Sequence, residues 1–244
     1  MSSAPGGQPG SENVGQQIHI VRQKMTSACF AAGRAPDAVR LLAVSKTFPA
    51  NAMRAAHACG QAAFGESYVQ EAVEKMHALA DLALEWHYIG PLQSNKTRQV
   101  AELFSWVHAV DRLKIAERLS AQRPPHLPAL NLCIQVNISG EASKAGVAPA
   151  QTLELARAIN ALPHLKLRGL MAIPEPAEGL EAQREPFHRL HELLTQLQAA
   201  GLACDTLSMG MSADLEAAIA EGATIVRVGT AIFGQRAYPA EAGA

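Results

Sequence analysis

The sequence predicts a single (β/α)8 barrel with an extra helix at its N-terminus. The chain has 244 residues, which is an ordinary length for one such barrel. Eight short apolar stretches recur at a spacing of roughly 20 to 40 residues, and a helical pattern follows each of them. Their apolar content suits parallel strands that are buried on both faces. An open doubly wound sheet is the alternative, but the chain has no GxGxxG segment to support a dinucleotide site.

The periodicity of the apolar residues also places the individual elements. The strands are expected at residues 41–46, 62–67, 84–90, 106–111, 130–138, 165–173, 206–210 and 224–230. The helices are expected at about 14–32, 50–59, 69–76, 94–104, 112–122, 149–161, 190–200 and 212–222, with Ser94 and Ser212 as N-caps. We divide the chain into a disordered tail over residues 1–12, a barrel over residues 13–238 and a C-terminal tail over residues 239–244.

Composition and charge exclude several classes of protein. The net charge is −1, so a nucleic-acid footprint or a basic membrane surface is not expected. No apolar run reaches the length of a membrane span, and the N-terminus lacks the basic and apolar segments of a secretory signal. The four cysteines are far apart, which argues against a metal site or a disulfide framework. We therefore expect a reduced, cytoplasmic protein with no membrane or nucleic-acid partner.

Lys46 ends the first apolar strand and has two interpretations. In one, its stem lies on apolar surface and its ammonium group reaches water. In the other, a pocket lowers the pKa of the ammonium group, and the neutral amine forms a Schiff base with an aldehyde. The strand alone favours the first interpretation. Residues at the ends of other strands favour the second.

The segments after the seventh and eighth strands have the composition of a phosphate site. Barrels often bind phosphate with these two loops and a helix N-terminus. Residues 208–212 supply the hydroxyls of Ser208 and Ser212 and a close backbone approach at Gly210. Each loop alone is explained as well by caps and turns, but both together favour an anion site. The expected phosphate-binding residues are Ser208, Gly210, Met211, Ser212, Gly229 and Thr230.

Arg227 adds a third group to this pattern. On the last strand it alternates with Ile225 and Gly229, so all three side chains share one face. If that face points into the barrel, the charge is costly and needs a partner. A surface salt bridge is the simpler explanation. A reactive lysine, a phosphate site and an arginine for a ring nitrogen are, however, what pyridoxal 5'-phosphate (PLP) requires.

Six stretches make the chain resemble the pyridoxal phosphate homeostasis family. They are LLAVSKT, FGESYVQE, LEWHYIGPLQSNK, LRGLMAIP, LSMGMSADLEAAI and VRVGTAIFG, and the resemblance runs from about Val14 to Arg236. It implies a barrel like the N-terminal domain of alanine racemase, with PLP held as a covalent aldimine on Lys46. It also places the phosphate at residues 208–212 and 229–230 and the pyridine nitrogen at Arg227. The family usually has Asn where this chain has Ser67. Serine can still form a hydrogen bond, but its shorter side chain reaches less far toward the cofactor.

Two functions remain open. A PLP carrier or regulator without turnover is favoured, and a PLP-dependent racemase or decarboxylase is the alternative. A Schiff-base aldolase on the same barrel is a third, weaker candidate. By the same resemblance, racemases and decarboxylases add a β-rich domain that supplies a second acid/base residue. We expect no such domain in the 14 residues after Thr230. Arginine is also a poor proton donor, which weakens the ring as an electron sink. Apo-enzymes that need PLP are candidate partners, and we expect a monomer, with a dimer as the alternative.

The remaining polar and sulfur-containing candidates receive simpler interpretations. His87 and His108 are expected to be packed core histidines, and Cys133 is expected to be a small buried residue. Glu66 is interpreted as a loop or cap partner. Lys96 and Lys144 are interpreted as solvated loop lysines that could also lie at the mouth of the site.

Overall fold

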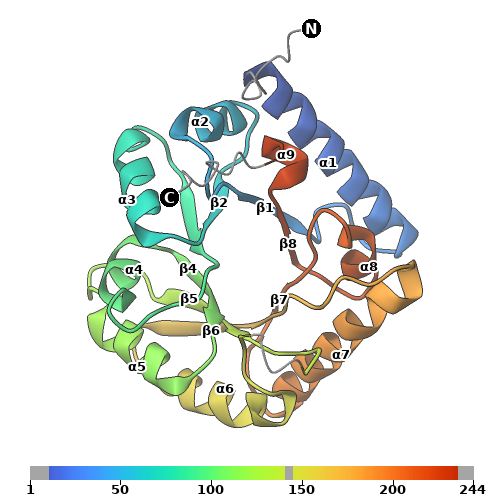
Figure 1. Ribbon diagram of the computed structural model, residues 1–244. Helices are drawn as coiled ribbons and strands as arrows, with labels where there is room; N and C mark the ends of the chain where they lie inside the picture. Colours follow the sequence, from blue (N-terminus) through green and yellow to red (C-terminus); the bar gives the residue numbers. More distant parts are fainter. Residues whose placement is uncertain (1–10, 141–144, 236–244) are drawn as a thin grey trace, which may run out of the picture.

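The chain folds into a closed barrel of eight parallel strands, as the sequence predicts (Figure 1). The computed structural model describes residues 11–140 and 145–235. The strands follow one another around the barrel in chain order. They are β1 (Arg40–Val44), β2 (Ala63–Glu66), β3 (Glu85–Tyr88), β4 (Trp106–Val110), β5 (Leu130–Gln135), β6 (Leu165–Met171), β7 (Thr206–Ser208) and β8 (Ile225–Val228). Each lies within or beside its predicted stretch, and Lys46 comes just after β1 rather than within it.

Helices cover the outside of the barrel, and α1 is the predicted extra helix. They are α1 (Ser11–Ala31), α2 (Ala50–Ala58), α3 (Val69–Ala78), α4 (Thr97–Leu103), α5 (Leu113–Gln122), α6 (Thr152–Asn160), α7 (Leu180–Ala199), α8 (Leu215–Ala220) and α9 (Thr230–Phe233), with a 3-10 turn η1 (Pro149–Gln151) before α6. α1 lies against α2, α8 and α9, closing the side of the barrel where the two ends of the sheet meet (Figure 1). Its buried side chains, Val14, Ile18, Val21, Met25, Ala28 and Cys29, recur at helical spacing.

Several predicted boundaries and caps are wrong. α1 begins at Ser11, so the last two residues of the predicted N-terminal tail are helical; the rest of that tail, the C-terminal tail over 239–244 and the end of the predicted barrel lie outside the described residues. Ser94 does not cap α4, which begins at Thr97; its carbonyl instead accepts a hydrogen bond from the Thr97 hydroxyl. The sequence analysis gave no bounds for the helix after the eighth strand, which is the short α9.

Ser212 does not cap the helix after β7 either. That helix, α8, begins three residues later, at Leu215. The cause is a turn over residues 211–214, in which Oδ1 of Asp214 accepts a hydrogen bond from the Met211 amide at 2.5 Å. An aspartate side chain that binds a nearby backbone amide competes with helix formation in this way.

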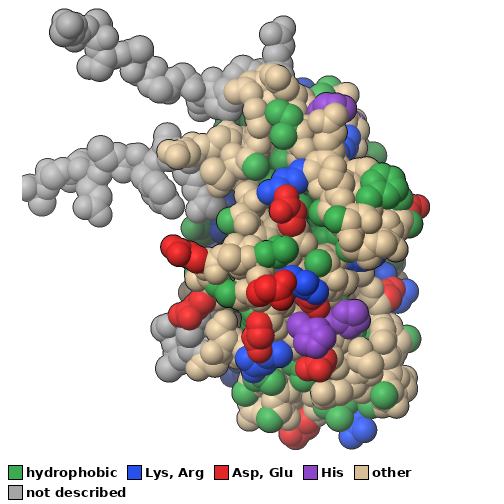
Figure 2. Space-filling model, turned by 90° about the vertical axis from the view of Figure 1, so that its right-hand side faces the viewer, with side chains coloured by type: hydrophobic (Ala, Val, Ile, Leu, Met, Phe, Trp, Pro, Cys, Tyr) green, Lys and Arg blue, Asp and Glu red, His purple; other side chains and the backbone are tan. Residues whose placement is uncertain are grey.

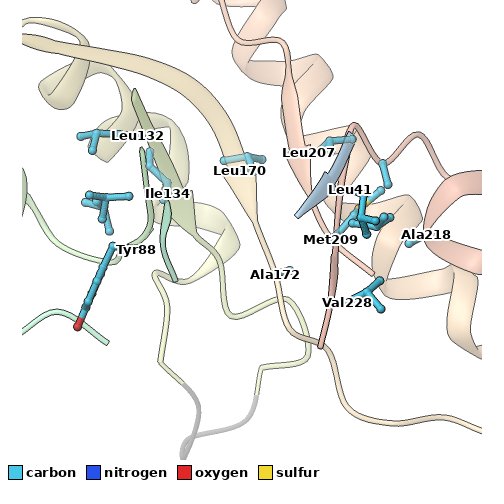
Figure 3. Packing of buried hydrophobic residues seen from close by; sticks show 14 of the residues in the cluster. Leu41, Tyr88, Leu132, Ile134, Leu170, Ala172, Leu207, Met209, Ala218 and Val228 are labelled. Carbon is cyan, nitrogen blue, oxygen red and sulfur yellow. The ribbon is translucent and has the colours of Figure 1, made fainter. Parts of the chain in front are cut away.

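Two apolar clusters hold the barrel together. The larger lies between the strands and the helices, and Figure 3 shows part of it. In it Ile134, Leu170 and Leu207 are paired in register on β5, β6 and β7. The smaller cluster fills the inside of the barrel and consists of Leu42, Ala63, Trp106, Ala109, Cys133, Met171 and Ile225. Because this inner cluster is small, polar side chains occupy much of the remaining interior.

The surface carries charges of both signs. On the face drawn in Figure 2, acidic and basic side chains are interspersed. Lys24 and Glu216 form one exposed ion pair, 3.5 Å apart. Within the described residues, no helix is long and apolar enough to cross a membrane.

Candidate functional site

The predicted site residues gather at the carboxyl ends of four strands that are neighbours in the barrel. Ala43 of β1 pairs with Phe64 of β2 on one side and with Val228 of β8 on the other. β8 in turn pairs with β7 through Ser208 and Ile225. Lys46, Ser67, residues 208–212, Arg227 and residues 229–230 therefore lie in or just beyond adjacent strands. In barrels of this kind, that end of the sheet carries the site.

The backbone before Lys46 is anchored by a buried ion pair. Nζ of Lys75, on α3, donates hydrogen bonds to the Ser45 carbonyl at 2.7 Å and to Oε1 of Glu66 at 2.8 Å. The Ser45 hydroxyl donates to the same carboxylate oxygen at 2.6 Å. Ser45, Glu66 and Lys75 are all buried. These bonds fix the residue before Lys46 to both β2 and α3.

The backbone after Lys46 is anchored by a second carboxylate. The Thr47 amide donates to Oε1 of Glu71 at 2.6 Å, and the same oxygen accepts from Lys75 at 2.5 Å. The Glu71–Lys75 contact is an i,i+4 ion pair on α3. Thr47 has φ of 69°, a left-handed conformation that is unusual for a residue other than glycine. Lys46 is thus held between two anchored neighbours, and its own side chain is half-buried.

Glu66 is the residue for which burial in this arrangement is unfavourable. Burial raises the pKa of its carboxyl, although Lys75 and Ser45 act in the opposite direction. Its second oxygen, Oε2, is buried without a hydrogen-bond partner among the described residues. The interpretation of Glu66 as a loop partner is confirmed, but Lys75, to which it is bonded, is a residue that the sequence did not connect with the site.

The two loops expected to bind phosphate have different structures. Gly210 has φ of 91°, and a Cβ at this position would lie 2.5 Å from Cβ of Ala218, so a glycine is required. Ser212 is half-buried and Thr230 is exposed. At Gly229, a Cβ would lie 3.1 Å from the Val44 carbonyl, so its missing side chain serves the contact between β8 and β1.

Two of the groups expected to bind phosphate already form hydrogen bonds within the protein. The Met211 amide donates to Asp214, as described above. Ser208 is fully buried in β7, and its hydroxyl lies 2.8 Å both from Nη1 of Arg227 and from Nδ1 of His108. The hydroxyl of Ser208 therefore belongs to the barrel interior, whereas that of Ser212 belongs to the loop.

Arg227 is a buried cation inside the barrel, as its alternation with Ile225 indicates. Its Nη1 donates to the carbonyl and hydroxyl of Ser208 at 2.5 and 2.8 Å, and its Nη2 donates to the Ala172 carbonyl at 2.8 Å. Within the described residues, none of these acceptors is a carboxylate. Burial lowers the pKa of Arg227 to about 10, so the guanidinium remains charged at neutral pH. These bonds do not use Nε.

The histidines form a connection that the sequence interpretation missed. His87 and His108 are buried, as expected, but Nδ1 of His87 lies 2.9 Å from Nε2 of His108, which continues to Ser208. Alternation along the third and fourth strands was the signal that could have placed both rings inside the barrel. Cys133 is buried, which raises the pKa of its thiol. Lys96 is half-buried and directly precedes α4, and Lys144 lies outside the described residues.

The fold and the placement of these residues define the class of protein. The family model described as alanine racemase, N-terminal domain, matches residues 30–237. Among curated proteins, the chain is similar to the pyridoxal phosphate homeostasis protein of Pseudomonas aeruginosa, with 61% identity over 229 residues, 94% of this chain and 98% of that protein. It is also similar to that of Escherichia coli K12, with 51% identity over 229 residues, 93% of this chain and 98% of that protein. The chain belongs to the pyridoxal phosphate homeostasis protein family.

Solved structures agree with this assignment. PipY of Synechococcus elongatus, solved with PLP bound, is 37% identical with a TM-score of 0.79, covering 91% of this chain and 100% of that chain. A protein of unknown function from Bifidobacterium adolescentis is 34% identical with a TM-score of 0.84, covering 91% of this chain and 95% of that chain. Alanine racemase of Clostridium difficile has a TM-score of 0.74 but only 13% identity, covering 94% of this chain and 58% of that one, so this likeness concerns the fold alone.

Proposed function

We propose that this protein binds PLP covalently through Nζ of Lys46 and serves PLP homeostasis without turning over amino acids. The observation that carries the proposal is the anchoring of Lys46. The residues before and after it are tied to Glu66 and Glu71, at the end of the barrel where the loops after β7 and β8 also lie. Membership of the family, and the PLP bound to PipY, support PLP as the ligand.

The chemistry of the available groups fits this ligand. Lys46 supplies the amine, the hydroxyls of Ser212 and Thr230 suit the phosphate, and the guanidinium of Arg227 suits a ring nitrogen. In this arrangement the pocket is shaped by Ser208, Gly210, Met211 and Gly229, whose side chains donate no hydrogen bond to the phosphate. Ser67 lines the pocket beside β1. PLP, when bound, supplies an aldehyde and an electron-withdrawing ring.

The charge on Arg227 disfavours the PLP chemistry that needs a protonated ring nitrogen. A guanidinium that keeps its proton near neutral pH does not give it to the ring nitrogen. The ring then withdraws electrons less strongly, and carbanion chemistry is disfavoured. We further propose a cytoplasmic monomer that passes PLP to apo-enzymes. The free cysteines Cys29, Cys59, Cys133 and Cys204 are consistent with a reducing compartment.

Absence of turnover is the first prediction. The PLP-loaded protein is incubated with L-alanine in deuterated water, and deuterium at the α-carbon and the D-isomer are followed by NMR and chiral chromatography. We expect neither to form at enzymatic rates, because racemisation needs a second acid/base group on the opposite face. Exchange at about 1 per second or faster would identify an enzyme instead. Transfer of PLP to an apo-enzyme without α-proton exchange is the companion result that we expect.

A second prediction concerns the phosphate end. Ser212→Ala should weaken PLP binding about ten- to a hundred-fold, because a hydrogen bond to a charged group contributes roughly 1.5 to 3 kcal/mol. Binding of pyridoxal, which lacks the phosphate, should change little. Dissociation constants from absorbance titrations of both ligands provide the comparison. An equal loss for PLP and pyridoxal would place Ser212 away from the phosphate.

A further inference from the structure

A line of polar contacts crosses the barrel interior from Glu85, at the amino end of β3, to Arg227 on β8. We call its five residues the interior relay: Glu85, His87, His108, Ser208 and Arg227. Oε1 of Glu85 lies 3.2 Å from Nε2 of His87, and Nδ1 of His87 lies 2.9 Å from Nε2 of His108. Nδ1 of His108 lies 2.8 Å from the Ser208 hydroxyl, which lies 2.8 Å from Nη1 of Arg227.

The fixed donors and acceptors at the two ends determine the direction of the hydrogen bonds. Arg227 can only donate, so the Ser208 oxygen accepts from it. The Ser208 hydroxyl is then free to donate to Nδ1 of His108. His108 carries its proton on Nε2 and donates to Nδ1 of His87. His87 in turn carries its proton on Nε2, which faces the carboxylate of Glu85.

Hydrogen bonds that ran in the opposite direction would be unfavourable at Glu85. If His87 donated from Nδ1, its Nε2 lone pair would face the Glu85 carboxylate, and the two would repel each other. The contact of Nε2 with Glu85 lacks good hydrogen-bond geometry, but its attraction is electrostatic and requires the N–H on that side. One arrangement of protons therefore satisfies the whole relay.

The surroundings of the relay keep both rings neutral. His87 and His108 are buried, and this burial lowers the pKa of each; for His108, the charges of Arg227 and Arg40 act in the same direction. Arg40 holds Glu85 from the other side through a bond of 2.6 Å. The contact with His87, and to a smaller extent the pairing with Arg40, lower the pKa of Glu85 to about 2, so the end of the relay stays anionic.

The relay fixes the orientation of the ring that meets Ser208. His87 is stacked on Trp106, with ring planes at 5° and centroids 5.4 Å apart. His108, bonded on both nitrogens, has no freedom to rotate without breaking a buried hydrogen bond. The Ser208 hydroxyl is consequently held with its lone pairs toward Arg227.

We propose that His108 is a positioning residue for Arg227: oriented by His87 and Glu85, it keeps the Ser208 hydroxyl an acceptor and thereby aims the guanidinium at the ring nitrogen of bound PLP. This inference rests on the proposed function and assigns a role to two histidines that the proposed function does not use. It predicts an effect specific to the ring nitrogen. The phosphate and the lysine should be unaffected.

The test compares PLP with an analogue in which C–H replaces the ring nitrogen. In the wild-type protein, PLP should bind more tightly than the analogue. His108→Leu and Ser208→Ala should each reduce this preference about tenfold or more, because the first leaves the Ser208 hydroxyl without the group that orients it and the second removes the hydroxyl that accepts from the guanidinium. His108→Asn keeps an acceptor near the position of Nδ1 and should retain the preference to within about threefold. The double variant His108→Leu/Ser208→Ala should lose no more than either single variant, since both changes break one relay.

Cys133→Ala is the matched control, because Cys133 lies in the smaller apolar cluster inside the barrel and is not part of the relay. Its preference should equal that of the wild type. If His108→Leu does not fold, Ser208→Ala decides the question. Folded variants that keep the wild-type preference would overturn the inference. So would a wild-type protein that carries PLP on Lys46 yet does not distinguish the two ligands. A wild-type protein that takes no PLP on Lys46 would instead contradict the proposed function.

Discussion

Replacing Lys75 with methionine should lower the free energy of unfolding by about 3–5 kcal/mol, because it strands a buried carboxylate. Nζ of Lys75 is the cation beside Glu66, whose side chain is 0% exposed and whose Oε2 already lacks a partner. The substitution also removes the bond to the Ser45 carbonyl and so releases the backbone before Lys46. Urea denaturation followed by circular dichroism gives the free energy directly.

Lys24→Met is the control for this experiment. It removes a lysine from an exposed ion pair with Glu216, where such pairs contribute between about 0 and 1 kcal/mol. A second control, Lys75→Met/Glu66→Gln, replaces the stranded carboxylate with a neutral amide and should regain much of the lost stability. A Lys75→Met protein as stable as Lys24→Met would contradict the burial argument.

The effect of pH follows from the raised pKa of Glu66. A carboxyl whose pKa is higher in the folded state than in the unfolded state binds more protons when folded, so the protein loses stability as the pH rises through that interval. Without Lys75, the hydrogen bond from the Ser45 hydroxyl is left to offset this loss. The Lys75→Met protein should therefore recover part of its stability as the pH is lowered from neutral toward the ordinary range of a carboxyl group, because Glu66 takes up a proton.

The sequence predicted the barrel well because its strands and helices differ in period. The apolar stretches gave all eight strands, and the helical spacing of Val14, Ile18 and Val21 gave the buried face of α1. The alternation of Arg227 with Ile225 put both residues on one face of β8 and left open whether that face points into the barrel; both are buried. These features are local, so a single sequence contains the information for them.

The predicted caps and the interior contacts show where local patterns are insufficient. Ser212 has the right composition for an N-cap, but the carboxylate of Asp214 closes a turn first and delays α8. The bond between His108 and Ser208 joins residues 100 positions apart. Such a pairing depends on how the strands are arranged around the barrel, and no spacing within the sequence reports it.

The most direct test of the central claim is the site of covalent PLP attachment. The purified protein is loaded with PLP, reduced with borohydride, digested and mapped by mass spectrometry. We expect the label on the peptide that contains Lys46, the lysine held between anchored Ser45 and Thr47.

Lys46→Ala should lose the label and the yellow colour almost completely while staying folded, because the bonds that anchor this segment are made by Ser45 and Thr47. A single labelled peptide containing Lys46, absent from a folded Lys46→Ala protein, is the result that the account predicts. A label on Lys96 or Lys144 in the wild type, or undiminished labelling of Lys46→Ala, would contradict it.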